Sequence, residues 1–152
     1  MLTVGDLLNH KGSNVWSVSP EATVHDAASL MSERNVGAVL VCSGTQIIGI
    51  LSERDCVRRV MLQRRSALTT HVAEVMTSPI KCVSLHESVD HCMELMTERR
   101  IRHLPVVEEG RLLGIVSMGD VMKAELSQQE NLISGLESYI HGTSASVRPP
   151  AL

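Results

Sequence analysis

Two stretches of this chain repeat one sequence pattern at an offset of 65 positions, as from Gly49 to Gly114. The match needs no gap over residues 18–55, and it includes the identical pairs Ser19/Ser84, Leu30/Leu95, Glu33/Glu98, Ser52/Ser117 and Asp55/Asp120. A period of this size indicates two copies of one supersecondary unit, neither of which buries its hydrophobic face alone. The chain is therefore expected to fold as one body made of two half-domains.

Within each copy the spacing of the apolar residues changes in the same order. Helical spacing over 24–31 is followed by two short apolar runs, at 36–42 and 46–52, with a turn signal between them. The motif Ser52-x-x-Asp55 then resembles the N-terminal cap of a second helix. With a strand before the first helix, each copy predicts the order β-α-β-β-α. The fold class is accordingly α+β, with tandem repeats related by pseudo-two-fold symmetry and a C-terminal helix.

Shorter segments flank the two copies. Residues 4–8 resemble residues 72–76, so a lead-in helix is predicted before each copy. Helical spacing continues from Leu126 to Ile140, and we expect this tail helix to pack on the body or on a second subunit. The last residues are polar and proline-rich, which predicts disorder. The predicted first repeat, second repeat, C-terminal helix and disordered tail occupy 1–65, 66–126, 127–141 and 142–152.

Composition excludes several classes of protein. There is no Phe, and Trp16 and Tyr139 lie near opposite ends of the chain, so a stacking platform for single-stranded nucleic acid is not expected. The net charge of −3 argues against a generally basic surface, although cations grouped at 54–65 and 99–102 allow a local basic pocket. The four cysteines lack zinc-ligand spacing and no long apolar run occurs. We expect a cytoplasmic protein with free thiols and no membrane partner.

Three segments resemble the signature of cystathionine β-synthase (CBS) domains. They are the two G-I-x-S-x-x-D motifs at 49–55 and 114–120 and the strand Arg-His-Leu-Pro-Val-Val at 102–107. The resemblance covers about residues 1–126. It implies a Bateman module, a pair of CBS repeats that often forms a disk-like homodimer and binds adenosine-containing ligands in its clefts. The family's ligands include AMP, ADP, ATP and S-adenosylmethionine.

A narrower resemblance concerns stand-alone proteins with two CBS repeats. The segments at 52–55, 62–66 and 100–105 are similar to such proteins of bacteria and plant organelles, a group assigned to signal transduction. The resemblance adds NAD(H) to the expected ligands.

Asp55 and Asp120 are the first candidates for ligand binding. A carboxylate offers two acceptor oxygens, which match the two hydroxyls of a ribose. The helix that opens at Ser52 or Ser117 would present free amide groups and a positive dipole end to a phosphate, and the Ser hydroxyls would serve the same anion. An ordinary capping box explains these residues equally without a ligand. The resemblance to CBS domains favours ligand binding.

Arginines follow the first motif. Arg54, Arg58 and Arg59 are expected on the first turns of the helix, where guanidinium groups suit a pyrophosphate. A solvated helix face is the alternative for Arg58 and Arg59. Arg64 and Arg65 would reach only a longer ligand such as a dinucleotide, and solvation is the favoured interpretation.

The strand of the second copy carries two further candidates, Arg102 and His103. Strand alternation would place them on opposite faces, so at most one of them is expected to point into a given cleft. Because aromatic side chains are scarce, adenine would be held between aliphatic walls. The other candidate nucleotide-binding residues are these wall residues and the neighbours of the motifs: Val18, Gly37, Ala38, Val39, Lys81, Val83, Leu104, Pro105 and Gly119.

The two copies differ at these positions. The first copy has Gly37-Ala38 where the second has Arg102-His103, and the second has Met118-Gly119 where the first has Glu53-Arg54. We therefore predict two clefts of unequal chemistry, which bind different adenosine ligands or leave one cleft empty.

The leading interpretation is a regulatory module that senses AMP, ADP, ATP or NAD(H), with S-adenosylmethionine as a further candidate, and signals as a homodimer to an unidentified protein target. The sequence has no P-loop, G-x-G-x-x-G or nucleophile elbow, so we expect no enzyme, no catalytic residue and no catalytic cofactor. The histidines are scattered, and no metal site is expected. One alternative is a ligand-free interaction adaptor. An RNA- or DNA-binding module, which draws only on the arginines of 54–65, ranks last.

Overall fold

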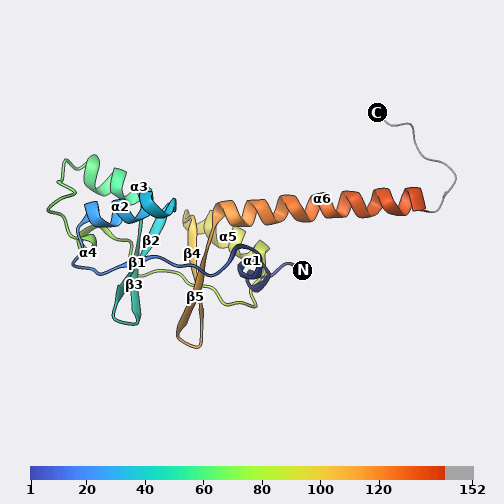
Figure 1. The fold of residues 1–152 in the computed structure, drawn as a ribbon, viewed down its shortest axis with the longest axis horizontal. Coiled ribbons are helices and arrows are strands. Elements are labelled where there is room, and N and C mark those ends of the chain that lie inside the picture. Colours follow the sequence, from blue (N-terminus) through green and yellow to red (C-terminus); the bar gives the residue numbers. More distant parts are fainter. Residues whose placement is uncertain (143–152) are drawn as a thin grey trace.

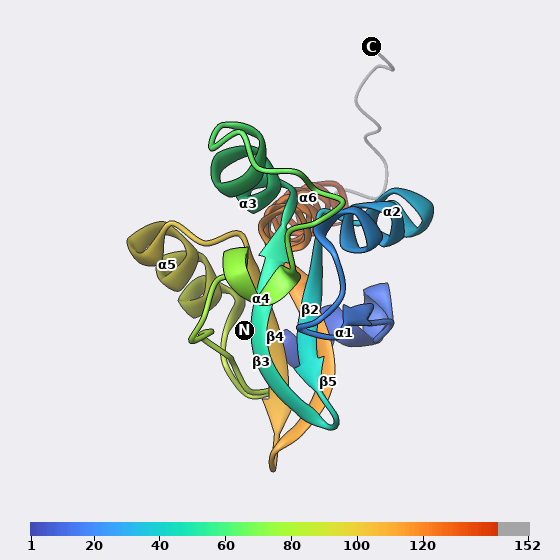
Figure 2. The same ribbon diagram turned by 90° about the vertical axis from the view of Figure 1, so that its left-hand side faces the viewer.

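In the computed structural model, which describes residues 1–142, the first repeat adopts the predicted order of elements, and the second does so except for its first strand. The first repeat contains β1 (Ser17–Val18), α2 (Val24–Arg34), β2 (Ala38–Ser43) and β3 (Gln46–Ser52). The second contains α5 (Val89–Arg99), β4 (His103–Glu108) and β5 (Arg111–Ser117). The two half-domains lie side by side, and one hairpin lies in front of the other when the molecule is turned (Figures 1 and 2). Residues 143–152 of the predicted disordered tail lie outside the described residues.

The sheets are small and follow the offset of the repeats. β1 pairs in parallel with β2, which pairs antiparallel with β3. β4 and β5 form the matching antiparallel hairpin, and the strand predicted before α5 is reduced to one parallel bridge between Val83 and Val106. The register shifts at equivalent places in the two hairpins, at Val41/Cys42 and at Val106/Val107. The repeat therefore extends to local irregularities of the backbone.

The helix after the first motif differs from the one after the second. A short α3 (Glu53–Asp55) continues into η1 (Cys56–Met61), a π-helical segment in which the Leu62 amide bonds to the Val57 carbonyl oxygen at 2.9 Å. After the second motif a regular helix, α6 (Met118–Gly142), runs without a break through the boundary predicted at 126/127. The α+β class, the tandem repeats and the C-terminal helix are confirmed.

The two lead-in helices are exchanged between the half-domains. α1 (Val4–Lys11) precedes the first repeat, but its residues Val4, Leu7 and Leu8 are buried in the core of the second repeat. α4 (Val72–Val75) precedes the second repeat, and Val72 and Val75 are buried in the core of the first. Figure 1 shows α1 beside β5 and α4 beside the first half-domain. Each core therefore includes a segment from the other half of the sequence.

This exchange explains the glycine of each G-I-x-S-x-x-D motif. A Cβ atom at Gly49 would lie 2.6 Å from Met76 Sδ and 2.9 Å from the Thr77 carbonyl oxygen, just after α4. A Cβ atom at Gly114 would lie 2.8 Å from Leu8 Cδ2 on α1. Each glycine is the place where the exchanged segment approaches the last strand of the other repeat.

Within residues 1–142, none of the helices combines the length and the apolar character that crossing a membrane requires.

Candidate functional site

Two clefts open where the half-domains meet, and they share Gly37 and His103. The larger has a volume of about 670 Å³ and is called the arginine cleft. It is lined by Gly37, Ile50, Ser52, Glu53, Arg54, Asp55, Arg58, Arg59, Thr77, Pro79, Ile80, Lys81, Arg99, Arg100, Ile101, Arg102, His103 and Pro105. The smaller, of about 420 Å³, is called the tryptophan cleft. Its lining is Lys11, Gly12, Asn14, Val15, Trp16, Asn35, Val36, Gly37, Ala38, His103, Ile115, Ser117 and Asp120.

Asp55 lines the arginine cleft and also belongs to the capping box of α3. Its Oδ2 accepts the Ser52 amide at 3.0 Å and the Ser52 hydroxyl at 3.1 Å. The Thr77 hydroxyl lies 3.3 Å from Oδ1 and 3.4 Å from Oδ2. The capping box considered from the sequence is therefore formed, and Oδ1 is the less occupied oxygen.

The start of α3 offers fewer free amides than the sequence implied. The Glu53 amide donates to the Gly37 carbonyl oxygen at 3.0 Å, and the Asp55 amide donates to the Ser52 hydroxyl at 3.1 Å. The second repeat repeats this pattern, because the Met118 amide donates to the Arg102 carbonyl oxygen at 2.8 Å. The Glu53 and Asp55 amides are therefore already bonded within the protein, and the Ser52 hydroxyl donates to Asp55 Oδ2.

The lining of the arginine cleft is strongly cationic. Seven cations, against the carboxylates of Glu53 and Asp55, line it: Arg54, Arg58, Arg59, Lys81, Arg99, Arg100 and Arg102. Arg102 and then Arg58 lower the pKa of the Arg54 guanidinium by like-charge repulsion. Within residues 1–142, neither Arg54, Arg58 nor Arg102 makes an ion pair. These cations are available to an anion that enters the cleft.

Arg59 has a structural role as well. Its Nη1 donates to the carbonyl oxygens of Val75 and Met76 at 3.2 and 3.0 Å, and its Nε lies 3.9 Å from Asp55 Oδ1. The side chain therefore ties η1 to the end of α4 and holds one charge beside the carboxylate.

The tryptophan cleft has a different electrostatic character. Asp120 Oδ2 accepts Lys11 Nζ at 2.6 Å and the Ser117 amide at 2.8 Å. Burial raises the pKa of Asp120, but the Lys11 and Ser117 hydrogen bonds outweigh it and leave this pKa below its ordinary value. Trp16 forms part of the wall, with the Arg34 guanidinium 4.2 Å from its ring centroid. The prediction of purely aliphatic walls is therefore wrong for this cleft.

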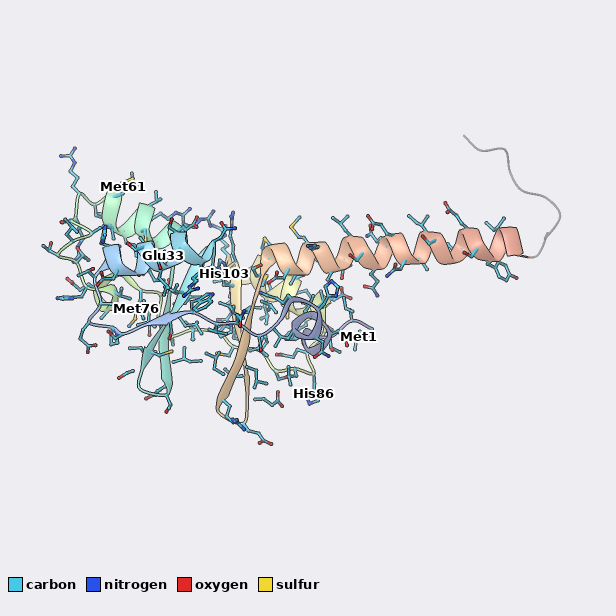
Figure 3. The ribbon with its side chains drawn as sticks, viewed as in Figure 1. Met1, Glu33, Met61, Met76, His86 and His103 are labelled. Carbon is cyan, nitrogen blue, oxygen red and sulfur yellow. The ribbon has the colours of Figure 1, made fainter. Side chains whose placement is uncertain are left out.

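His103 separates the two clefts. A Cβ at Gly37 would lie 3.7 Å from its Nε2, and Figure 3 shows the side chain where the half-domains meet. Burial lowers its pKa, Asp120 and Asp55 raise it, and Lys11 and Arg102 lower it further; the net shift is downward. Charged groups from both clefts therefore shift the pKa of His103.

Most predicted site residues line one of the clefts. Those at the arginine cleft are Gly37, Ser52, Arg54, Asp55, Arg58, Arg59, Lys81, Arg102, His103 and Pro105. Ala38, Ser117 and Asp120 are at the tryptophan cleft. Arg102 and His103 both line the arginine cleft, against the prediction from strand alternation, because β4 begins at His103 and Arg102 precedes it.

Five predicted residues line neither cleft. Val39, Val83 and Leu104 are buried in the hydrophobic cores and cannot form cleft walls. Val18 packs against the core of the first repeat, and Gly119 is exposed. The aliphatic-wall prediction failed because these strands turn the named side chains inward. Outside both clefts, Arg65 forms an ion pair with Glu74 at 2.5 Å.

Sequence reasoning missed several lining residues. Arg99 and Arg100 were visible only as part of a basic group, and Thr77, Lys11 and Trp16 belong to no motif. The exchange of lead-in segments brings Lys11 and Thr77 to the clefts, so no local sequence pattern predicts that they line them. Among residues 1–142, no group of His, Cys, Asp and Glu side chains is arranged to hold a metal ion.

The family model for the CBS domain matches residues 1–62 and 72–127. The chain belongs to the CBS domain family. A pair of CBS repeats explains why each of the two clefts is lined by one of two equivalent motifs. The chain is 35% identical to the mitochondrial CBS domain-containing protein CBSX3 of Arabidopsis thaliana over 150 residues, which cover 92% of this chain and 72% of that protein.

Solved structures agree with this CBS pair. A protein with CBS domains from Burkholderia ambifaria MC40-6 has a TM-score of 0.81 and 44% identity, over 84% of this chain and 96% of the other. The CBS domain pair of protein MJ0100, solved with 5′-methylthioadenosine and S-adenosyl-L-methionine, has a TM-score of 0.75 and 21% identity, over 84% and 98% of the two chains. At that identity the second likeness shows the fold alone.

Proposed function

We propose that this CBS pair is a regulatory module that binds a phosphate-bearing adenosine ligand in the arginine cleft and signals its level, as a homodimer, to an unidentified protein. The observation that carries the proposal is the meeting of Asp55 with unpaired arginines in one cavity of about 670 Å³. Ligand pockets commonly have volumes of about 300–1,000 Å³. AMP, ADP, ATP and NAD(H) are the candidate ligands.

The chemistry of the cleft supports each part of such a ligand. Arginine side chains bind phosphate oxygens with charge-assisted, often bidentate hydrogen bonds. Asp55 Oδ1, which accepts one long hydrogen bond from the Thr77 hydroxyl, would accept a ribose hydroxyl. Ile50, Ile80 and Ile101 supply the apolar wall that adenine needs, in place of the valines and leucine predicted from the sequence. The adenosine ligands of protein MJ0100 support the ligand class at the level of the fold.

The net positive charge of the arginine cleft favours ligands with phosphate groups over a ligand with a sulfonium group. S-Adenosylmethionine carries a positive sulfonium, which the cations of the arginine cleft would repel. The tryptophan cleft, where Lys11 already neutralises Asp120, lacks this excess of cations. We therefore assign the phosphate-bearing ligand to the arginine cleft and a different occupancy to the tryptophan cleft.

The adaptor alternative draws on one observation, an exposed apolar stripe on α6. An adaptor would not respond to nucleotides, so ligand-induced stabilisation separates the two functions. The concave position of the arginines favours a small anion over RNA or DNA, which would need a continuous exposed surface.

Thermal denaturation with AMP, ADP, ATP, NAD+ or S-adenosylmethionine tests the proposal. A ligand at about 100 times its Kd stabilises the folded state by about 2.7 kcal/mol. Asp55→Asn should weaken binding at least about tenfold, so at the same concentration of a phosphate ligand the stabilisation should fall to about 1.4 kcal/mol or less. Asp26→Asn is the matched control, because Asp26 completes the same kind of capping box on α2 but lies outside both clefts. Equal responses of the two variants would refute the assignment of Asp55.

A further inference from the structure

The C-terminal helix carries an apolar stripe that its own body does not cover. Figure 1 shows most of α6 projecting away from both half-domains. Met122, Leu126, Ile133 and Leu136 are each at least 55% exposed. With Gln129 and Ile140, these residues follow one another at steps of four, three, four, three and four positions. That alternation is the heptad spacing of a coiled-coil seam.

The stripe is separate from the face that holds α6 to the body. Val121 is buried in the core of the second repeat, and Ala124 packs against that core. Glu125 turns toward Asp90 of α5, whose hydrogen bond raises the pKa of the Glu125 carboxyl. The helix α6 therefore contacts the body through residues 121, 124 and 125, near its beginning. The seam residues lie on a neighbouring face and continue for about 27 Å along the axis.

We propose that α6 pairs with α6 of a second copy of this chain in an antiparallel coiled coil. The stripe is symmetric about its midpoint, so one register matches every seam position. Met122 lies opposite Ile140 of the second copy, Leu126 opposite Leu136, and Gln129 opposite Ile133. Each seam residue then packs against a seam residue of the other helix. Gln129 is the only polar residue of the seam.

Charges beside the seam select the antiparallel direction. In this register Lys123 lies next to Glu137 of the second copy, twice by symmetry, and Leu132 meets its own equivalent. The only like-charge contact is between the two Glu130 side chains at the centre. A parallel pair would instead place Glu125 beside Glu130 twice, next to Asp90. Opposite charges at flanking positions set helix orientation in coiled coils.

The helix pair lies outside both CBS repeats and both clefts. It requires no ligand and no residue of the proposed nucleotide site. The two bodies would lie at opposite ends of the paired helices, because Val121 and Ala124 on the first turns of α6 pack on the body. Loss of this pairing and loss of nucleotide binding are therefore separable.

Cross-linking of the full chain tests the proposal. In the antiparallel register residue 130 faces its own equivalent, so Glu130→Cys should give a covalent dimer with a short bis-maleimide, at least about tenfold above the parent chain and above Asn131→Cys. Residue 131 lies on the outer face of the pair and is the matched control. A yield for Glu130→Cys no higher than that of Asn131→Cys overturns the proposal, as does efficient disulfide formation by Leu136→Cys, which indicates parallel helices.

A second pair of variants separates pairing through the stripe from random collision. Ile133→Lys, added to Glu130→Cys, should abolish the covalent dimer, whereas Ser134→Lys on the outer face should preserve it. Persistence of the cross-link with Ile133→Lys would contradict a seam contact. Circular dichroism of each variant confirms that α6 is retained.

Discussion

Lys11 and Asp120, which both line the tryptophan cleft, form an ion pair with Nζ 2.6 Å from Oδ2. The same Nζ donates to the Ile115 carbonyl oxygen at 2.8 Å. Asp55, at the equivalent position of the first repeat, has the Thr77 hydroxyl and a more distant Arg59 instead. Two aspartates related by the repeat therefore have different electrostatic surroundings. The exchange of α1 into the second core produces this difference, since Lys11 ends that helix.

The ion pair should stabilise the fold in a pH-dependent way. Because the pKa of Asp120 is below its ordinary value in the folded state, the contact contributes at neutral pH and is lost as the pH falls below about 4. A double-mutant cycle with Lys11→Met and Asp120→Asn should give a coupling energy of about 1 kcal/mol at pH 7, after allowance for partial solvent exposure. Urea denaturation measures it. A coupling that is equal at pH 7 and in acid would contradict this account.

Ligand binding in the arginine cleft should be coupled to protonation of the His103 imidazole. The imidazole faces Asp120 of α6, Asp55 of α3, Lys11 of α1 and Arg102, and its pKa is lowered. Phosphate in the arginine cleft adds negative charge, raises this pKa and so favours the protonated ring. Affinity for NAD+, whose pyrophosphate keeps its charge over the range, should rise up to about tenfold per unit of pKa shift as the pH falls from about 7.5 to 5.5.

The control for that prediction is His103→Gln, which keeps a polar side chain and cannot titrate. Calorimetry at several pH values should show a flat profile for this variant. A slope identical to that of the parent chain would assign the proton to another group.

Replacement of Gly49 and of Gly114 by alanine should cost different amounts of folding stability. Gly49→Ala would place Cβ 2.9 Å from the Thr77 carbonyl oxygen, which is backbone and cannot move cheaply, so a loss of about 1–3 kcal/mol is expected. Gly114→Ala meets the mobile methyl groups of Leu8 and should cost less. Gly135→Ala, with nothing within 4 Å on α6, should be neutral or stabilising. Urea denaturation ranks the three, and a Gly114→Ala loss above that of Gly49→Ala reverses the expected order.

The fluorescence emission of Trp16 should report ligand binding in the tryptophan cleft and not in the arginine cleft. It is the single tryptophan of the chain and lines only that cleft of the two. Saturation of the arginine cleft should leave its emission unchanged, and any later change at higher ligand concentration should vanish in Asp120→Asn. An emission change that follows the first binding event would place the ligand beside Trp16.

The repeat made much of the fold predictable. The shared offset located both hairpins, both amphipathic helices and the two Ser-x-x-Asp caps, because hydrophobic spacing and capping act over a few residues. The exchange of α1 and α4 was not predictable, since an apolar helix face shows that a helix packs on a core but not which core it packs on. The π-helical segment after Asp55 likewise left no recognisable pattern.

The candidate site was predictable to a similar extent. Asp55 and Arg54 lie within the motif and Arg58 follows it, with a solvated helix face as its alternative, and all three line the arginine cleft. Val39 and Leu104 were misplaced because a strand with a buried inner face turns its large aliphatic residues into the core. Lys11 and Thr77 arrive from the exchanged segments, and only tertiary structure can place them.

Isothermal titration calorimetry of ADP and NAD+ into the parent chain, Asp55→Asn and Asp26→Asn tests the central claim most directly. We predict saturable binding of at least one ligand to the parent chain, unchanged affinity in Asp26→Asn and at least about tenfold weaker binding in Asp55→Asn, the loss of a hydrogen bond to a charged group. Absence of binding to the parent chain, or equal affinity in all three proteins, would contradict a nucleotide site in the arginine cleft.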